Sequence, residues 1–265
     1  MPNTKDIVLG SAQKILFVGA NGRGKTCAAA TFPGPIKFYD FDGRMQPVKY
    51  MFPEKDIEYE TYDARNYHVF AGEFNSLTNH CPWKTIVIDS VTSLSMTLIL
   101  YQLRLRASGR KVSGGIDVTG WDEINGETVS ISQILNTCLC LPCHVIFTAH
   151  PVARTQILDG KSVQSQTLVS YGNKINSILP GRFNEIYWFK FEPSIDTSKA
   201  AKRLVYTVGS EEEFAKTALP LPSVIDITNK SLYDIIQDAV KSHNISLEIG
   251  GGNESVKTTN KLVAF

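Results

Sequence analysis

A glycine-rich segment near the start of the chain carries the residues best suited to chemistry. It reads Gly19-Ala20-Asn21-Gly22-Arg23-Gly24-Lys25-Thr26 and is followed by Cys27. Glycines let the backbone turn its N–H groups inward around phosphate oxygens, because they adopt backbone angles that other residues avoid. A lysine in such a loop reaches the β- and γ-phosphates of a nucleotide, and the hydroxyl beside it ligates Mg²⁺. The spacing therefore predicts a nucleotide-phosphate site at Gly19 and residues 21–27, centred on Lys25 and Thr26.

A carboxylate is expected at the same place from a different part of the chain. Asp89 ends the apolar run Thr85-Ile86-Val87-Ile88, which has the composition of a buried strand. At the carboxyl edge of a parallel sheet this side chain would face the nucleotide and hold Mg²⁺ through water, so Thr26 and Asp89 form the predicted metal site. Asp89 also suits the N-cap of a following helix, and both roles can hold together.

Two other strand ends carry candidate catalytic residues. Asp40 and Asp42 follow the expected strand at 36–39. Only one of the two is expected to point into the site, and we select Asp42 as the carboxylate that orients the attacking water. His150 ends a later strand, a position suited to sensing the γ-phosphate, although a lone histidine is more often structural.

The elements that must position these residues alternate along the chain. Strands are expected at 15–18, 36–39, 85–89, 144–148, 185–189 and 203–208, and helices from 27, at 67–79, 91–106, 121–141 and 231–242. Strands that alternate with helices predict an α/β fold with a mostly parallel sheet and helices on both faces. The polar stretches 107–120 and 151–171 lack periodicity and are expected to be loops.

Composition sets the remaining limits. The chain has 265 residues, 43% of them hydrophobic, and a formal net charge of +1. We expect one domain at 12–245, an N-terminal segment at 1–11 and a flexible tail at 246–265 with three consecutive glycines. No apolar run is long enough for a membrane span and no signal layout is present, so no membrane partner is expected. Five cysteines at spacings unlike a disulfide framework favour a cytoplasmic location.

A cluster of basic residues is a candidate DNA-binding surface. Arg104, Arg106, Arg110 and Lys111 lead into a loop that ends Ser113-Gly114-Gly115. Concentrated positive charge on flexible backbone suits phosphodiester binding. The alternative is a solvated helix end, where cations interact favourably with the helix dipole.

The chain resembles RecA-type recombinases, and more closely the small phage RecA-like ATPases known as AAA-domain nucleotide-binding proteins. The run from Thr85 to Leu94 resembles the Walker B strand and its helix, and Phe38-Tyr39-Asp40-Phe41-Asp42 resembles the strand that ends in the catalytic carboxylate. Val145-Ile146-Phe147-Thr148-Ala149-His150 is similar to the strand that ends in a sensor glutamine, which His150 replaces. Phe214-Ala215-Lys216 resembles a segment whose lysine reaches a neighbouring subunit's nucleotide, which gives Lys216 a trans-acting role.

The resemblance implies a RecA-like P-loop ATPase core with ATP and Mg²⁺ as cofactors. It also implies self-assembly into a ring or filament on single-stranded DNA, in phage-type recombination, annealing or replication in a bacterial host cytoplasm. A single-strand DNA-binding protein is a further expected partner. The segments 107–120 and 153–172 would correspond to the two DNA-binding loops of RecA.

Two alternatives use the same core. One is a helicase or packaging-type motor, which would need processive strand separation. The other is a nucleotide-gated assembly or regulatory factor whose partner is a protein, and whose hydrolysis would be indifferent to DNA.

Overall fold

A computed structural model describes residues 10–107, 121–158, 161–168, 178–194, 201–210 and 213–250. The main sheet contains β1 (Lys14–Val18), β2 (Ile36–Asp40), β3 (Ile57–Thr61), β4 (Thr85–Asp89), β5 (His144–Ala149), β8 (Glu185–Glu192), β9 (Lys202–Tyr206) and β10 (Val224–Asp226). The helices are α1 (Lys25–Ala29), α2 (Gln46–Met51), α3 (Tyr67–Ser76), α4 (Val91–Ala107), α5 (Trp121–Cys140) and α7 (Leu232–Gly250), with a 3-10 helix η2 (Leu179–Arg182).

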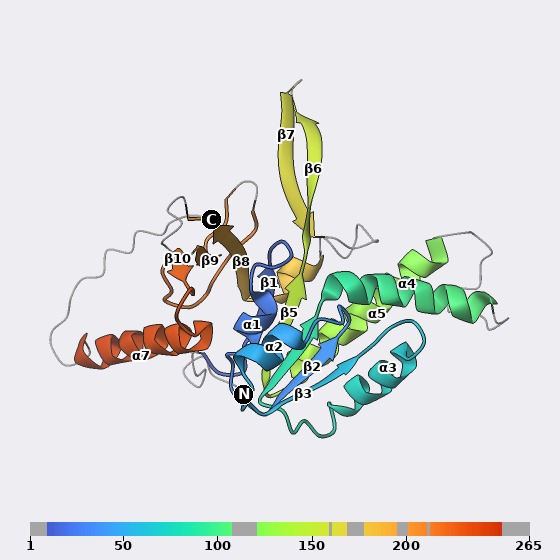
Figure 1. Cartoon of the computed structure of the whole chain (residues 1–265), viewed down its shortest axis with the longest axis horizontal. Coiled ribbons are helices and arrows are strands. Elements are labelled where there is room, and N and C mark those ends of the chain that lie inside the picture. Colours follow the sequence, from blue (N-terminus) through green and yellow to red (C-terminus); the bar gives the residue numbers. More distant parts are fainter. Residues whose placement is uncertain are drawn as a thin grey trace.

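The strands of the main sheet lie in the order β10-β9-β8-β1-β5-β4-β2-β3 (Figure 1). From β8 to β3 every pair of neighbours is parallel, whereas β9 and β10 are antiparallel to theirs. β5 lies between β1 and β4, so the strand before the glycine-rich loop and the strand that ends in Asp89 are not neighbours. This topology confirms the predicted class, an α/β fold with a mostly parallel sheet.

Strand register brings the predicted site residues to one edge of the sheet. Val18 pairs with Ala149, and Asp40 lies opposite Asp89. The glycine-rich loop after β1 and the chain after β5, β4 and β2 therefore leave the sheet side by side. Parallel strands bring their carboxyl ends together, which is why this edge collects residues from four separate parts of the sequence.

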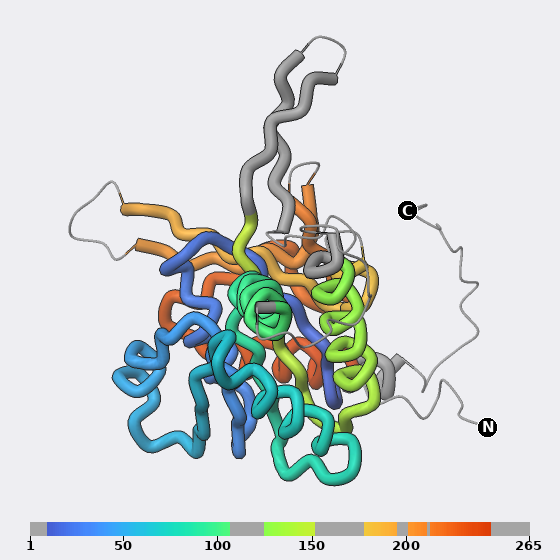
Figure 2. The backbone as a smooth tube through the Cα atoms, turned by 90° about the vertical axis from the view of Figure 1, so that its right-hand side faces the viewer, coloured from blue at the N-terminus to red at the C-terminus, as the bar shows by residue number. Residues whose placement is uncertain are grey.

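The sheet is buried on both faces by helices. Along β1, Leu16 and Val18 belong to one apolar cluster and Ile15 and Phe17 to another, because successive strand residues point to opposite sides. The first cluster includes buried residues of α3, α4 and α5, and the second those of α1, α2 and α7. Figure 2 shows α4 and α5 side by side. Helices thus cover both faces, as the sequence predicts.

The expected loop at 151–171 is wrong over most of its length. β6 (Pro151–Leu158) and β7 (Lys161–Leu168) form an antiparallel ribbon that stands away from the main sheet (Figure 1). Its Val, Thr and Ile residues favour strands, and the sequence pair Asp159-Gly160 is typical of two-residue hairpin turns. That turn signal could have identified the hairpin.

Smaller differences concern exposed elements. β3, β10 and α2 have no clear apolar pattern, and β3 is an edge strand with mostly exposed side chains. α7 continues to Gly250, so the domain boundary expected after residue 245 falls inside a helix. The segment 1–9 and the tail from 251 lie outside the described residues. None of the helices in the described part of the chain has both the length and the apolar character to cross a membrane.

Candidate nucleotide-binding site

The glycine-rich loop connects the carboxyl end of β1 to α1. Gly24, the N-cap of α1, has φ 93°, a left-handed conformation that costs about 1 kcal/mol or more for a residue with a Cβ atom. At Gly19 a Cβ atom would lie 2.7 Å from the carbonyl oxygen of Phe189, so close packing excludes a side chain. Because α1 has only five residues, the N–H groups of the loop are better placed to bind phosphate than a helix dipole.

Lys25 is the buried cation of this loop. Its Nζ donates hydrogen bonds to the carbonyl oxygens of Gly19 (2.6 Å) and Ala20 (3.1 Å) and lies 3.2 Å from Nδ1 of His150. Burial lowers the pKa of Lys25 to about 8, and the nearby carboxylate of Asp89 opposes that shift. A phosphate group would also favour the ammonium form, because opposite charges stabilise each other. Phosphate binding and protonation of Lys25 are therefore coupled.

Thr26 and Asp89 supply the oxygen ligands that Mg²⁺ prefers. The Thr26 hydroxyl donates to Oδ2 of Asp89 at 2.8 Å, and the Thr148 hydroxyl donates to Oδ1. Burial raises the pKa of Asp89, against the effect of these two hydrogen bonds. Among the described residues, no group of three or more His, Cys, Asp or Glu side chains could hold a metal alone. These residues therefore fit a Mg²⁺ ion that takes its remaining ligands from phosphate and water.

Asp42 is held as an ionised acceptor by three donors. Ser90 Oγ donates to its Oδ1 at 3.0 Å, Ser93 Oγ donates to the same oxygen, and Nε2 of His150 lies 3.2 Å from Oδ2. Burial alone would raise the pKa of Asp42, but the hydrogen bonds from His150, Ser93 and Ser90 outweigh it and lower the pKa to about 2. So acidic a carboxylate accepts a proton poorly, and it is better suited to orienting a water molecule than to deprotonating it.

Asp40 has a different task. Its carboxylate accepts hydrogen bonds from the backbone N–H groups of Asp42 (3.0 Å), Gly43 (2.8 Å) and Arg44 (3.1 Å). A side chain that accepts from the backbone just after it stabilises a tight turn. The turn directs the chain so that Asp42, and not Asp40, lines the pocket of Lys25.

His150 connects Lys25 to Asp42. Its Nδ1 contacts Nζ of Lys25 and its Nε2 contacts Oδ2 of Asp42, both at 3.2 Å. An ammonium can only donate and a carboxylate can only accept, so a neutral imidazole with its proton on Nε2 satisfies both contacts. The backbone N–H of His150 donates to the Thr92 hydroxyl at 3.0 Å, which anchors the end of β5 to α4.

One open pocket collects these residues. The residues that line it are Asn21, Gly22, Arg23, Gly24, Lys25, Thr26, Cys27, Asp42, Arg44, Pro47, Met51, Asp89, His150 and Arg203. The sequence did not predict a role for Arg44 and Arg203. The same holds for the hydroxyls of Ser90, Ser93 and Thr148. Ser90 and Ser93 come shortly after Asp89 in the sequence, so this proximity could have identified them as residues of the site. No local pattern marks Arg203, which arrives from a distant strand.

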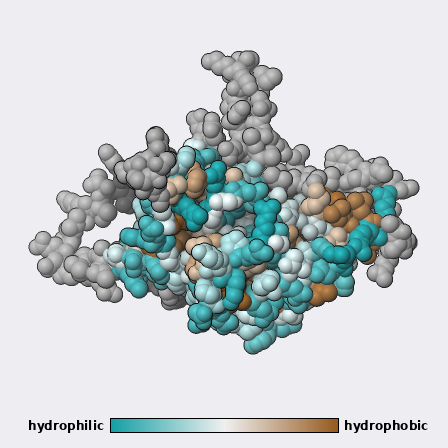
Figure 3. Space-filling model, viewed as in Figure 1, coloured by the Kyte–Doolittle hydropathy of each residue, from teal (hydrophilic) through white to brown (hydrophobic). Residues whose placement is uncertain are grey.

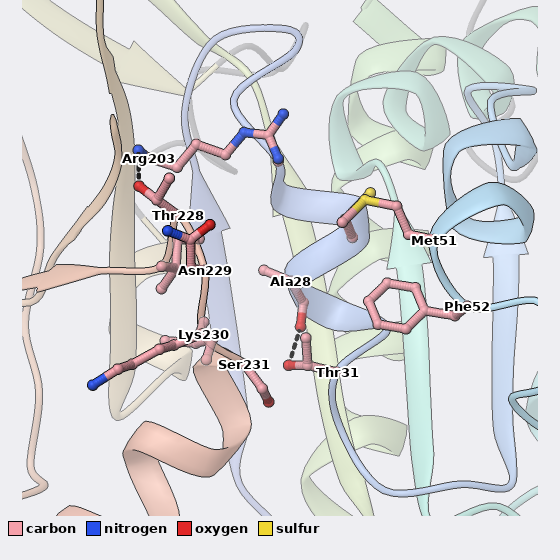
Figure 4. Close-up of a pocket in the computed structure, with 13 residues that line it drawn as sticks. Ala28, Thr31, Met51, Phe52, Arg203, Thr228, Asn229, Lys230 and Ser231 are labelled. Carbon is pink, nitrogen blue, oxygen red and sulfur yellow. Dashed lines mark hydrogen bonds between the residues drawn. The ribbon is translucent and has the colours of Figure 1, made fainter. Parts of the chain in front are cut away.

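A second hollow lies beside α1 and adjoins this pocket, with which it shares Met51 and Arg203 (Figure 4). One wall is formed by Met51 and Phe52 at the end of α2, and α1 contributes Ala28 and Thr31. The opposite wall is formed by Arg203 of β9 and residues 227–232, which connect β10 to α7. The hollow is mainly apolar with a few polar groups, the lining that is typical of sites for flat organic ligands.

The predicted DNA-binding residues lie apart from this pocket. Arg104 is exposed and Arg106 is half-buried, both in the last turn of α4, whose carboxyl end points away from α1 (Figure 1). Arg110, Lys111 and the rest of 108–120 lie outside the described residues.

Lys216 lies beside β8. Its backbone exchanges two hydrogen bonds with Ile186, at 2.8 and 3.0 Å. Ile186 pairs with Leu16 in the middle of β1, and not with the end that leads into the glycine-rich loop. Lys216 is therefore not part of the pocket of its own chain.

Comparisons with known proteins give one family match and one structural likeness. No curated protein matches the chain. Among solved structures, flagellar accessory protein FlaH from Methanocaldococcus jannaschii is similar with a TM-score of 0.42 and 12% identity, over 82% of this chain and 84% of that one. The family model described as an AAA domain matches residues 11–219. The chain therefore belongs to the AAA domain family.

Proposed function

We propose that this protein binds ATP with Mg²⁺ and hydrolyses it. The observation that carries the proposal is the convergence of Lys25, Thr26, Asp42, Asp89 and His150 in one pocket beside the glycine-rich loop. These groups come from four strand ends, and each has a defined task in phosphoryl transfer to water. Lys25 binds the β- and γ-phosphates, and Thr26 and Asp89 hold the metal, which neutralises phosphate charge when bound.

The hydrolytic half of the proposal depends on Asp42. Hydrogen bonds fix its carboxylate in the pocket, where it would accept from the attacking water and orient it toward the γ-phosphate. His150 would respond to the γ-phosphate because Lys25 has to exchange one of its present acceptors for a phosphate oxygen.

The second hollow supports a nucleoside triphosphate over a simple phosphate ester. It adjoins the phosphate pocket and provides an apolar wall at Met51 and Phe52, with the Asn229 amide on the opposite wall (Figure 4). An asparagine amide can pair with N6 and N7 of adenine, since it has one donor and one acceptor side. The sequence has no guanine-reading Asn-Lys-x-Asp motif. Both observations favour ATP.

We further propose single-stranded DNA as the partner, bound by a self-assembled ring or filament. The basic residues at the end of α4 support this, as does the ribbon β6–β7, which begins at Pro151, directly after His150. A change at His150 on γ-phosphate binding would reach the ribbon through a single peptide bond.

The test is ATP hydrolysis by the purified protein with and without single-stranded DNA, in parallel with Lys25→Ala. The expected result is Mg²⁺-dependent hydrolysis that DNA stimulates and that Lys25→Ala removes. Hydrolysis that DNA does not change, together with no DNA binding at low salt, would overturn the DNA part and leave the ATPase. No ATP binding by the wild-type protein would overturn both.

A second candidate is a nucleotide-gated factor with a protein partner. It is favoured by an exposed apolar stripe on α4, formed by Met96, Leu100 and Leu103, which are 38%, 45% and 43% exposed. Apolar atoms gather at this place on the surface in Figure 3. Positions 96, 100 and 103 lie on one side of a helix, so they present a continuous strip. For this candidate, Leu100→Ser would abolish partner binding and DNA would leave hydrolysis unchanged.

A further inference from the structure

Arg203 lies where the phosphate pocket and the second hollow meet, and it lines both of them. It comes from β9, far in sequence from the glycine-rich loop. We propose that Arg203 binds the α-phosphate of the nucleotide held by the same chain. The inference rests on the proposed ATP binding, and it adds a ligand that neither the loop motif nor the family match assigns.

The position of Arg203 is fixed by its backbone. Its N–H donates to the Thr228 hydroxyl at 2.9 Å, and its carbonyl oxygen accepts from the N–H of Ile227 at 2.9 Å. The side chain then passes along the loop, because a Cβ atom at Gly24 would lie 3.6 Å from Cδ of Arg203. Figure 4 shows the guanidinium extending across the hollow toward the start of α1.

The charge of Arg203 is not used elsewhere in the described part of the chain. The ion pairs found there join Lys37 to Glu58, Arg65 to Asp63, His150 to Asp42 and Lys190 to Glu213. Its field does reach α1, since it opposes the rise that burial causes in the pKa of the Cys27 thiol. A half-buried guanidinium without a carboxylate, beside a phosphate-binding loop, suits an anionic ligand, and its planar fork matches phosphate oxygens.

The order of groups along the pocket selects the α-phosphate. His150 contacts both Lys25 and Asp42, and these three residues mark the end where water attacks the γ-phosphate. Arg203 instead adjoins Gly24 and borders the hollow proposed for the base. A group between the γ-phosphate end and the base meets the α-phosphate.

This location makes a kinetic prediction. The α-phosphate is present in both ATP and ADP and its charge hardly changes during hydrolysis. Arg203 should therefore contribute equally to binding of substrate and product, and affect Kd far more than kcat. An arginine directed at the γ-phosphate would do the reverse, because it would stabilise charge in the transition state.

The experiment measures Kd for ATP and for ADP, and kcat, in the wild-type protein, Arg203→Ala, Arg203→Lys and Lys202→Ala. Lys202→Ala is the matched control, because it removes the same charge from an exposed side chain that faces the other side of the strand. We expect Arg203→Ala to raise both Kd values by the same factor, about tenfold or more, as for the loss of a hydrogen bond to a charged group. kcat should stay within about threefold, Arg203→Lys should recover part of the affinity, and Lys202→Ala should match the wild type.

Thermal unfolding provides the second readout. Without nucleotide, Arg203→Lys should have the same Tm as the wild type. The rise in Tm that ADP causes should be smaller in the variant than in the wild type. Unchanged ADP affinity in Arg203→Ala would overturn the inference, and so would a fall in kcat with intact ADP binding. Lys25→Ala separates the two proposals. If Lys25→Ala no longer binds ATP while Arg203→Ala keeps wild-type affinity, only the assignment of Arg203 fails. A wild-type protein that binds no nucleotide would overturn both proposals.

Discussion

The parallel and antiparallel parts of the sheet build the two ends of the candidate nucleotide site in different ways. The parallel strands present Lys25, Asp42, Asp89 and His150, whose side chains are hydrogen-bonded to one another or to nearby hydroxyls. The antiparallel side presents Arg203, whose backbone is fixed but whose side chain is open to the pocket. A pre-arranged network suits chemistry, and an open wall suits binding. Substitutions of Asp42 and His150 at the first end should therefore change kcat, and those at the second end should change Kd, whereas Lys25 binds phosphate and affects both quantities.

The largest expected effect is that of Asp42→Asn. The amide keeps the size of the side chain but has one acceptor oxygen and no charge, so the water would lose its orientation. We expect kcat to fall about a hundredfold or more, with the Kd for ADP unchanged. Steady-state hydrolysis and calorimetric ADP binding measure the two quantities. Asp238→Asn, an exposed carboxylate on α7, is the control. An unchanged kcat in Asp42→Asn would contradict the distinction between a hydrogen-bonded end that serves chemistry and an open end that serves binding.

His150→Ala should have the next largest effect. It removes two contacts within the network, and at about 1 kcal/mol for each hydrogen bond kcat should fall about thirtyfold. His150→Gln offers one acceptor and one donor and should recover most of the rate. If Gln is no better than Ala in a hydrolysis assay, the link between Lys25 and Asp42 is not what His150 contributes.

A pH titration tests the charge of Lys25. The pKa of this buried lysine is lowered to about 8, so the ammonium that binds phosphate is present below that pH and is lost above it. ATP affinity should be nearly constant up to about pH 7 and about tenfold weaker at about pH 9, because ATP binds the protonated form. Calorimetry across this range provides the measurement. Lys25→Ala should bind weakly at every pH, and the same pH dependence in that variant would exclude Lys25 as its source.

The smallest expected effect is that of Asn229→Ala, in the hollow proposed for the base. Asn229→Ala removes about one hydrogen bond, so the Kd for ATP should rise about fivefold. Inorganic triphosphate, which has no base, should bind the variant and the wild type equally. Asn79→Ala, an exposed residue after α3, is the matched control. Equal losses for ATP and triphosphate would place Asn229 at the phosphates and not at the base.

Local patterns in the sequence were enough to predict residues that the structure brings together in one pocket. The spacing of Gly24, Lys25 and Thr26 is contiguous, so the sequence predicts the loop without any knowledge of the fold. Asp89 and His150 were found because apolar runs identify buried strands and the next residue marks the carboxyl edge. The α/β class followed from the same alternation of strands and helices, and the strand topology confirms it.

Exposed elements were predicted less well, because they have no apolar face to reveal them. β3 is an edge strand whose side chains are mostly exposed, and its sequence resembles a loop. The β6–β7 ribbon is a two-stranded element outside the main sheet, and only its turn dipeptide marks it. Hydrophobic periodicity detects burial, so it misses elements that are not buried.

The sequence by itself determined the fold class, and it was enough to predict the phosphate-binding loop and the carboxylates proposed to hold the metal and orient the water. Each depends on residues that are neighbours in the chain or on the periodicity of one element. Only the tertiary structure decided that Arg203 and Asn229 meet α1 and α2 across a common hollow. That meeting depends on β8 pairing with β1 and on β9 turning back antiparallel to β8. Strand order is set by the packing of the whole sheet and its helices, and no local stretch of sequence encodes it.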